Sequence, residues 1–164
     1  MKTSVLETPA LRSAGRAGMR PGEDRGLSPE RVQALKWWCV ARADEWFAEG
    51  ELGAARDFLR HAAALDPRDD CVWLALGSVH YLLGELAEAG LAFLRAVRLR
   101  PGHARAWLQL ALVHERMGQP GLAVMLVRQA RELDPNDEAI RVAWERLERS
   151  CGCEPVERPR AHTS

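Results

Sequence analysis

The sequence predicts an all-α solenoid: three stacked helical hairpins with an N-terminal helix extension and a C-terminal capping helix. Three observations predict this fold. Apolar residues recur at helical spacing from about residue 28 to residue 149, with no alternating run typical of a β-strand. Glycine and proline interrupt this pattern at regular intervals. Several positions also keep their identity through three successive units of the chain.

The first ordered element is expected to begin near residue 28. Residues 1–27 are rich in glycine, arginine, serine and proline without sustained periodicity, so we predict a disordered leader. In the segment LSPER that follows, Ser28 can cap a helix and Pro29 suits the first helical position. The N-terminal helix extension is therefore predicted to start here.

Three repeats of 34 residues follow this extension. Each unit is expected to contain a helix, a turn at glycine, a second helix and a turn that ends the unit at proline. We place the repeats at about residues 36–69, 70–103 and 104–137. Five positions hold one residue type in all three units: Gly50, Gly84 and Gly118; Ala55, Ala89 and Ala123; Ala62, Ala96 and Ala130; Leu65, Leu99 and Leu133; Pro67, Pro101 and Pro135.

The C-terminal capping helix is predicted over residues 138–149. Its apolar residues Ile140, Ala143, Trp144 and Leu147 have helical spacing and would cover the last repeat. Repeats and cap together form one domain, residues 28–150. Residues 151–164 contain proline and arginine without periodicity and are expected to form a flexible tail.

Composition excludes several classes of partner. Of 164 residues, 47% are hydrophobic and 28% charged, with 23 basic and 23 acidic side chains, so no basic excess indicates binding to nucleic acid or an anionic membrane. No apolar run is long enough for membrane insertion, and the N-terminal residues lack the apolar core of a secretory signal. We expect a cytoplasmic protein with reduced cysteines. Because only Lys2 and Lys36 are lysines, the arginine bias indicates a GC-rich bacterial genome.

The middle unit resembles the tetratricopeptide repeat. It carries Trp73-x-x-Leu76-Gly77-x-x-His80, then Ala89-x-x-x-Phe93, Ala96 and Pro101, against the family pattern W-x2-L-G-x2-Y, A-x3-F and P. The third unit follows the same pattern closely, and the first follows it in its second half. The resemblance covers about residues 36–149. It implies that hairpins stack because one hairpin alone cannot bury its apolar face.

The resemblance also implies a binding site. In this family the first helix of each hairpin lines a concave groove, at repeat positions 2, 5, 9 and 12. The predicted groove set is Trp37, Val40, Asp44 and Phe47 in the first row; Cys71, Leu74, Ser78 and Tyr81 in the second; and Arg105, Leu108, Leu112 and Glu115 in the third. Family members that bind the carboxylate tails of heat-shock chaperones use basic residues and asparagine here. This largely apolar set instead favours an extended apolar segment of a partner protein.

Histidine and cysteine offer little chemistry. His80 and His114 occupy the same repeat position, which Trp46 fills in the first unit, so we interpret them as packing residues that replace the usual tyrosine. A ligand pair or proton relay is the alternative, but no carboxylate or cysteine position accompanies them to complete a metal site. Cys39 and Cys71 are interpreted as small helix residues.

The thiol motif Cys151-Gly152-Cys153 has only His162 as a nearby ligand, in the expected tail. We also find no phosphate-binding loop and no nucleophile paired with a base. No catalytic residue, metal or cofactor is therefore predicted.

The predicted function is a cytoplasmic chaperone or adaptor for a partner protein. The layout and the segment LDPRDDCVWLALG (65–77) resemble the class II chaperones of bacterial type III secretion, which hold hydrophobic translocators. An assembly adaptor of a pilus, secretion or envelope complex is the alternative, and a metal- or thiol-dependent accessory protein a further one. The sequence leaves open whether the chain is a monomer or a homodimer.

Overall fold

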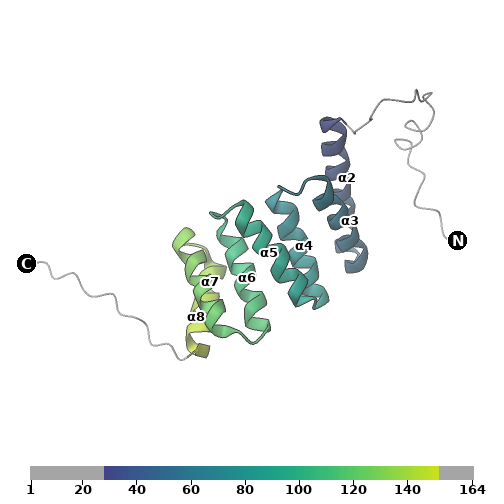
Figure 1. Cartoon of the computed structure of the whole chain (residues 1–164). Coiled ribbons are helices and arrows are strands. Elements are labelled where there is room, and N and C mark those ends of the chain that lie inside the picture. Colours follow the sequence, from purple (N-terminus) through teal and green to yellow (C-terminus); the bar gives the residue numbers. More distant parts are fainter. Residues whose placement is uncertain (1–27, 152–164) are drawn as a thin grey trace, which may run out of the picture.

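The structure, a computed structural model, describes residues 28–151, and these residues form seven α-helices and no strand (Figure 1). The helices are stacked in chain order, so that the first and the last lie at opposite ends of the stack (Figure 1). The predicted all-α solenoid is confirmed. The leader (1–27) and residues 152–164 of the predicted tail lie outside the described residues. The helices are α2 (Pro29–Ala48), α3 (Leu52–Leu65), α4 (Asp70–Leu83), α5 (Leu86–Leu99), α6 (Ala104–Arg116), α7 (Pro120–Leu133) and α8 (Glu138–Cys151).

The turn within each hairpin depends on the repeated glycine. Gly50, Gly84 and Gly118 have φ values of 82°, 80° and 73°, and they are the residues with positive φ among those described. Residues with a Cβ rarely adopt this left-handed conformation, which reverses the chain directly after a helix. The 34-residue glycine spacing therefore marks the three tight turns.

The turn between hairpins is held by the tryptophan that begins the next helix. The indole Nε1 of Trp73 donates a hydrogen bond to the carbonyl of Pro67 at 3.0 Å. The indole of Trp107 donates to the carbonyl of Pro101 at 2.8 Å, one repeat further on. Each tryptophan thus fixes the proline turn from which its own helix starts.

The core runs along the stack instead of filling one centre. The two repeated alanine positions, represented by Ala89 and Ala96, are fully buried in all three units because helices approach closely there. The repeated leucine differs, since Leu99 and Leu133 remain exposed at the ends of their helices. Small residues at the contacts and larger ones around them give a continuous apolar layer from α2 to α8.

Gly77 leaves room for the Phe93 ring within the middle hairpin. A Cβ built on this glycine would lie 2.7 Å from two ring atoms of Phe93, which is fully buried. The equivalent pairs are Ala43 with Leu59 in the first hairpin and Ala111 with Val127 in the third. Only the hairpin with a phenylalanine on one side has a glycine on the other.

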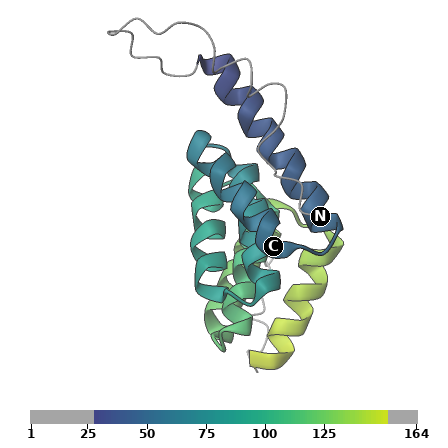
Figure 2. The ribbon, with the colours of Figure 1, turned by 90° about the vertical axis from the view of Figure 1, so that its right-hand side faces the viewer.

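The N-terminal extension is continuous with the first repeat helix. Ser28 caps α2 by accepting a hydrogen bond from the backbone N–H of Arg31 at 3.4 Å, and Pro29 is its first residue. The N-terminal end of α2 projects past the neighbouring helices (Figure 2), and residues 33–35 are exposed. The extension therefore adds length to α2 without forming a separate helix.

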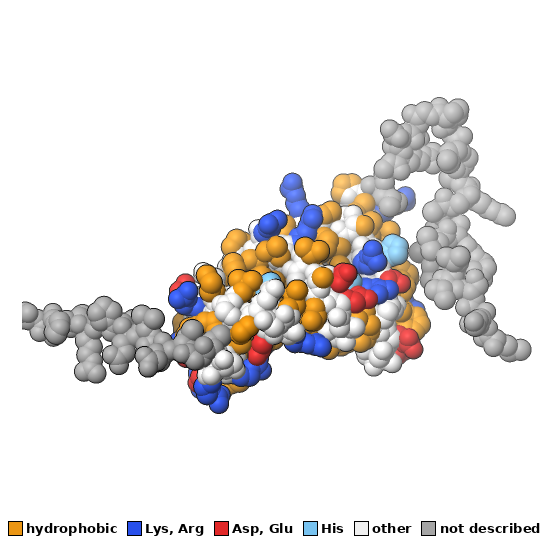
Figure 3. Space-filling model, turned by 60° about the horizontal axis from the view of Figure 1, so that its bottom comes forward, with side chains coloured by type: hydrophobic (Ala, Val, Ile, Leu, Met, Phe, Trp, Pro, Cys, Tyr) orange, Lys and Arg blue, Asp and Glu red, His pale blue; other side chains and the backbone are white. Residues whose placement is uncertain are grey.

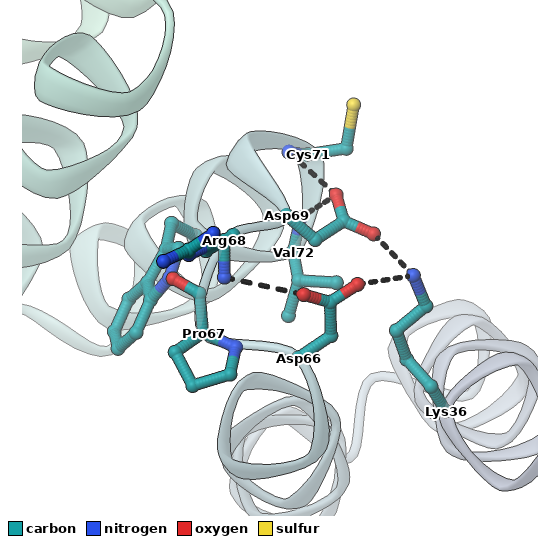
Figure 4. A network of polar contacts seen from close by, with 8 residues as sticks. Lys36, Asp66, Pro67, Arg68, Asp69, Cys71 and Val72 are labelled. Carbon is teal, nitrogen blue, oxygen red and sulfur yellow. Dashed lines mark hydrogen bonds and ion pairs between the residues drawn. The ribbon is translucent and has the colours of Figure 1, made fainter. Parts of the chain in front are cut away.

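Lys36 fastens α2 to the turn between the first two hairpins (Figure 4). Its side chain is buried, and its ammonium donates to Asp66 at 2.9 Å and to Asp69 at 2.8 Å. Burial acts to lower the pKa of Lys36, but the two carboxylates outweigh it and hold that pKa above its usual value. The hydrogen bond from Lys36 lowers the pKa of Asp66. Asp69 also caps α4, because it accepts hydrogen bonds from the N–H groups of Cys71 and Val72. The same turn therefore holds α2 through Lys36 and starts α4.

No helix within residues 28–151 is long and apolar enough to cross a membrane.

Candidate functional site

The third row of the predicted groove set lies in a cleft between α6 and α8. The cleft has a volume of about 710 Å³, and Arg105, Leu108 and Leu112 of α6 line it. Leu108 is only 5% exposed because it also packs against the buried face of α8. Leu112 is half-buried and Arg105 exposed. Three of the four predicted third-row residues thus share one hollow.

A fourth row of residues completes this cleft and was missed by the sequence analysis. Ala139, Val142 and Arg146 of α8 line the wall that faces α6. They stand 34 residues after Arg105, Leu108 and Leu112. The missed signal was the repeat period itself, since α8 was interpreted only as a cap although it continues the same register. Val142 is 48% exposed and gives this wall an apolar contact surface.

Two ion pairs join the walls of the α6–α8 cleft. Glu115, the remaining third-row residue, pairs with Arg146 at 2.6 Å. Arg105 and Asp137 lie 3.8 Å apart at the other end of α6. The charges that the sequence analysis placed in this row therefore have partners across the cleft, and the surface between them is apolar.

The second row lies on α4, partly covered by its neighbours. Leu74 and Tyr81 are half-buried and pack against the core between α4, α5 and α6. Arg116 lies over the Tyr81 ring, 4.6 Å from its centroid, and donates a hydrogen bond to the Tyr81 carbonyl. The Ser78 hydroxyl donates to the Leu74 carbonyl of its own helix at 2.9 Å. Cys71 is exposed at the first turn.

The first row lies on α2 and is the most exposed of the three. Trp37 is 60% exposed and Phe47 46%, while Asp44 is exposed and Val40 half-buried against the first core cluster. Large apolar side chains exposed in one region indicate a contact surface. Binding of a partner by the groove set, now including Ala139, Val142 and Arg146, stays a prediction.

One face of the molecule is mixed in character. Figure 3 shows this face, where hydrophobic side chains lie between basic and acidic residues. The face in this view is neither uniformly basic nor uniformly acidic.

The repeated histidines form polar contacts, and His80 is buried whereas His114 is half-buried. The imidazole Nδ1 of His80 hydrogen-bonds to Glu85, the residue before α5, and Arg56 donates to the other carboxylate oxygen at 3.0 Å. His114 makes the equivalent contact to Gln119 at 2.7 Å. Each histidine therefore ties the end of its helix to the start of the next. Trp46 fills this position in the first unit, and its buried Nε1 has no hydrogen-bond partner among the described residues.

Replacing Glu85 with glutamine is expected to remove a pH-dependent part of the stability. The hydrogen bond with His80, with a further contribution from Arg56, holds the pKa of Glu85 below its usual value. Such a group stabilises the folded chain above its unfolded pKa, and this stability is lost as pH falls through the folded pKa. Urea unfolding should give wild type a higher midpoint than Glu85→Gln at pH 7, and the difference should be smaller at pH 3.

Glu88→Gln serves as the control for this measurement. Glu88 is exposed on the same helix without an ion pair to another described residue. Its substitution should leave the midpoint unchanged at both pH values. A difference between wild type and Glu85→Gln that does not vary with pH would contradict the role assigned to the Glu85 carboxylate.

Among the described residues, one group of side chains that could bind a metal ion lies close together, at the start of α4. Donor atoms of Asp69, Asp70 and Cys71 lie within 4.8 Å of one another. Asp69 is already bound to Lys36, and Asp70 accepts from His103 at 3.1 Å. Although Cys71 is exposed, partial desolvation of its thiol and the charges of Asp70 and Asp69 raise its pKa, which disfavours the thiolate that metals require. The group is therefore a set of helix-start contacts. Of the Cys151-Gly152-Cys153 motif, Cys151 ends α8, and the rest lies outside the described residues with His162.

Comparison with known proteins identifies the repeat. Residues 72–103 and residues 104–147 each match a family model described as tetratricopeptide repeat. No curated protein matches the sequence. Together with the stacked hairpins, the two matches define a helical-repeat protein. The chain is a tetratricopeptide-repeat protein.

Solved structures of similar fold share little sequence with this chain. The first tetratricopeptide-repeat domain of Spaghetti (RPAP3), bound to an HSP90 peptide, has a TM-score of 0.70 and 16% identity, covering 73% of this chain and 95% of that one. The Arabidopsis OM64 tetratricopeptide-repeat domain has a TM-score of 0.69 and 16% identity, covering 73% of this chain and 98% of that one. A third structure is the Yersinia enterocolitica type III secretion chaperone SycD in complex with a peptide of the translocator YopD. It has a TM-score of 0.66 and 17% identity, covering 76% of this chain and 97% of that one.

Proposed function

We propose that the chain is a non-catalytic protein-binding module whose concave groove holds an extended apolar segment of a partner protein. The observation that carries this proposal is the α6–α8 cleft, in which two successive rows of the groove set face one another across an apolar floor. A segment lying along the stack would place side chains between rows, where pockets provide most of the affinity.

The charges of the groove favour an apolar partner over an acidic C-terminal tail. The side chains of Arg105 and Arg146 each face a carboxylate of the protein itself. An arginine that binds a ligand carboxylate would first have to give up this partner. The positions at which related domains carry basic residues and asparagine are Val40, Asp44, Leu74, Ser78, Leu108 and Leu112 in this chain. The groove therefore suits apolar anchors.

The experiment uses an array of 12-residue peptides that differ in apolar content. Wild type should bind the apolar peptides, whereas Val142→Asp and Phe47→Asp should weaken binding about tenfold or more, as expected for contact residues of an interface. Both side chains are exposed, so the variants should fold. Leu108 is unsuitable for this test because it belongs to the core.

Met125→Asp is the matched control, since Met125 is 58% exposed on α7, a second helix of a hairpin. It should bind the array as wild type does. Equal binding by wild type, both groove variants and the control would contradict the groove as the binding site. Thermal unfolding followed by circular dichroism verifies that each variant is folded.

Within this function we propose a cytoplasmic chaperone of bacterial type III secretion as the narrower role. The fold likeness to SycD, which is seen with a translocator peptide, supports this choice. An adaptor of a pilus, secretion or envelope assembly is the alternative. The genes beside this one decide between the two: translocator and secretion-apparatus genes would favour the chaperone, and pilus or envelope assembly genes the adaptor.

A further inference from the structure

A second and larger cleft lies between α3 and α5, the second helices of the first two hairpins. Its volume is about 1020 Å³. Trp73, Leu76 and His80 of α4 form its floor, and the walls come from α3 and α5. It contains no residue of the groove set, because those residues lie on a different face of α4. The α3–α5 cleft is therefore a separate surface.

Three arginines at this cleft have no ionic partner. Arg60 of α3 and Arg95 and Arg98 of α5 form no ion pair with any residue of the range 28–151. Arg95 lies over the Trp73 ring, 4.8 Å from its centroid, with its donors available. Arg56, by contrast, is paired with Asp57 and Glu85. Glu88, which also lines the cleft, is unpaired within the described range as well, so three positive charges against one negative charge leave the uncompensated charge of the cleft positive.

An exposed leucine stands among these arginines. Leu91 lines the cleft and is 69% exposed, more than the other exposed large hydrophobic residues of the described chain. Leu99, also exposed, lines the same wall. The cleft therefore combines free positive charge with an apolar contact.

The arginines do not follow the repeat pattern. One unit further along, the positions of Arg60, Arg95 and Arg98 are occupied by Leu94, Gln129 and Glu132. The buried alanines, by contrast, recur in every unit. This arrangement of three arginines therefore belongs to the α3–α5 cleft and not to the repeat.

We propose that the α3–α5 cleft is a second binding surface, which takes an acidic segment of a partner protein that carries apolar side chains. Charge complementarity with Arg60, Arg95 and Arg98 selects the acidic groups, and Leu91 receives an apolar side chain. The segment would bind on the side of the molecule formed by the second helices. Both surfaces can then be occupied at the same time.

The test measures the fluorescence polarisation of a fluorescein-labelled 15-residue peptide, Glu-Glu-Leu repeated five times, with the full chain. The peptide should bind, and more weakly as salt is raised, because screening reduces attraction between exposed charges. Arg60→Glu with Arg98→Glu should reduce affinity at least tenfold. Arg128→Glu with Arg149→Glu changes net charge equally away from the cleft and should have little effect.

A second pair of variants tests the apolar contact. Leu91→Asp should reduce affinity at least tenfold, whereas Met125→Asp, at the equivalent position of the next unit, should not. Val142→Asp should leave this peptide's affinity unchanged. A loss with Val142→Asp would place the peptide in the groove and overturn the second site, while the groove would remain the binding site of the proposed function.

Three further results would overturn the proposal. The first is no binding of the acidic peptide, or equal binding of a Lys-Lys-Leu peptide of the same length. The second is an equal loss in the two double-arginine variants, which would indicate nonspecific attraction. The third is tighter binding of a labelled 15-nucleotide thymidine oligomer that depends on Arg60 and Arg98, which would identify nucleic acid as the partner class.

Discussion

Replacing Lys36 with methionine is expected to lower the free energy of unfolding by about 3 kcal/mol, because it leaves two half-buried carboxylates without their cation. Lys36 is 4% exposed, and it bridges Asp66 and Asp69 from a different helix. The expected value lies at the lower end for a broken buried pair because both carboxylates keep some contact with water. Chemical denaturation at pH 7 measures it.

The effect of Lys36→Met should depend on pH. The pKa of Asp66 is lowered in the folded chain, so its stabilising effect is lost as pH falls through that pKa. The pKa of Lys36 is raised, so its effect is present below the unfolded value and lost as pH rises through the folded one. The difference between wild type and Lys36→Met should therefore be full from about pH 5 to pH 10 and smaller at pH 3.

Arg42→Met provides the control on the same helix. Arg42 pairs with Glu45 three residues further along, and both side chains are largely exposed to water. A surface pair of this kind contributes about 0.5 kcal/mol or less. If Lys36→Met lowered the free energy of unfolding no more than Arg42→Met, the Lys36 contact would be worth no more than a surface ion pair. It would then not be what holds α2 to the next turn.

The fold could be predicted because its determinants repeat. Each glycine turn and each buried alanine contact occurs three times at the same spacing, so a local signal too weak to interpret once becomes clear when it recurs. The same reasoning interpreted His80 and His114 as packing residues, and His80 is buried whereas His114 is half-buried. It missed their hydrogen bonds to Glu85 and Gln119, although those two residues also follow the 34-residue period.

Contacts whose residue types change from unit to unit could not be predicted in this way. The Lys36 contact joins residues 30 and 33 positions apart, and the next unit makes it with the charges reversed, from Asp70 to Arg100 and His103. In a sequence, a single lysine near the start of a helix looks like any exposed residue. The uncompensated charge at the α3–α5 cleft is likewise invisible, because it depends on which arginines find a partner in space.

The groove prediction assigned residues to one face of each helix, but it did not predict how deeply each residue is buried. Repeat positions placed Leu108 and Trp37 on equivalent faces, yet α8 buries Leu108 whereas no described helix covers Trp37. Burial therefore depends on the neighbouring unit, which differs at the two ends of a stack. Extending the repeat register into α8 would have predicted Val142 and Arg146 at the cleft.

Replacing Gly77 with alanine is the second change expected to destabilise the chain strongly, by about 2 kcal/mol. The new Cβ would lie 2.7 Å from the fully buried ring of Phe93, which cannot move without displacing its neighbours. Overpacking of this kind costs about 1–3 kcal/mol, and alanine returns about 1 kcal/mol of helix propensity. Gly90→Ala is the control, because its Cβ would meet Val113 at an ordinary 3.6 Å and should stabilise the chain.

Combining Gly77→Ala with Phe93→Val should recover about half of this loss, because the pair then matches Ala111 and Val127 of the third hairpin. Phe93→Val alone should cost about 2 kcal/mol by leaving a cavity. The double variant should cost about 1 kcal/mol, whereas independent effects would sum to about 4 kcal/mol. Unfolding free energies that simply add would show that Gly77 and Phe93 do not limit each other's size. The close approach at Gly77 would then have no part in setting the distance between α4 and α5.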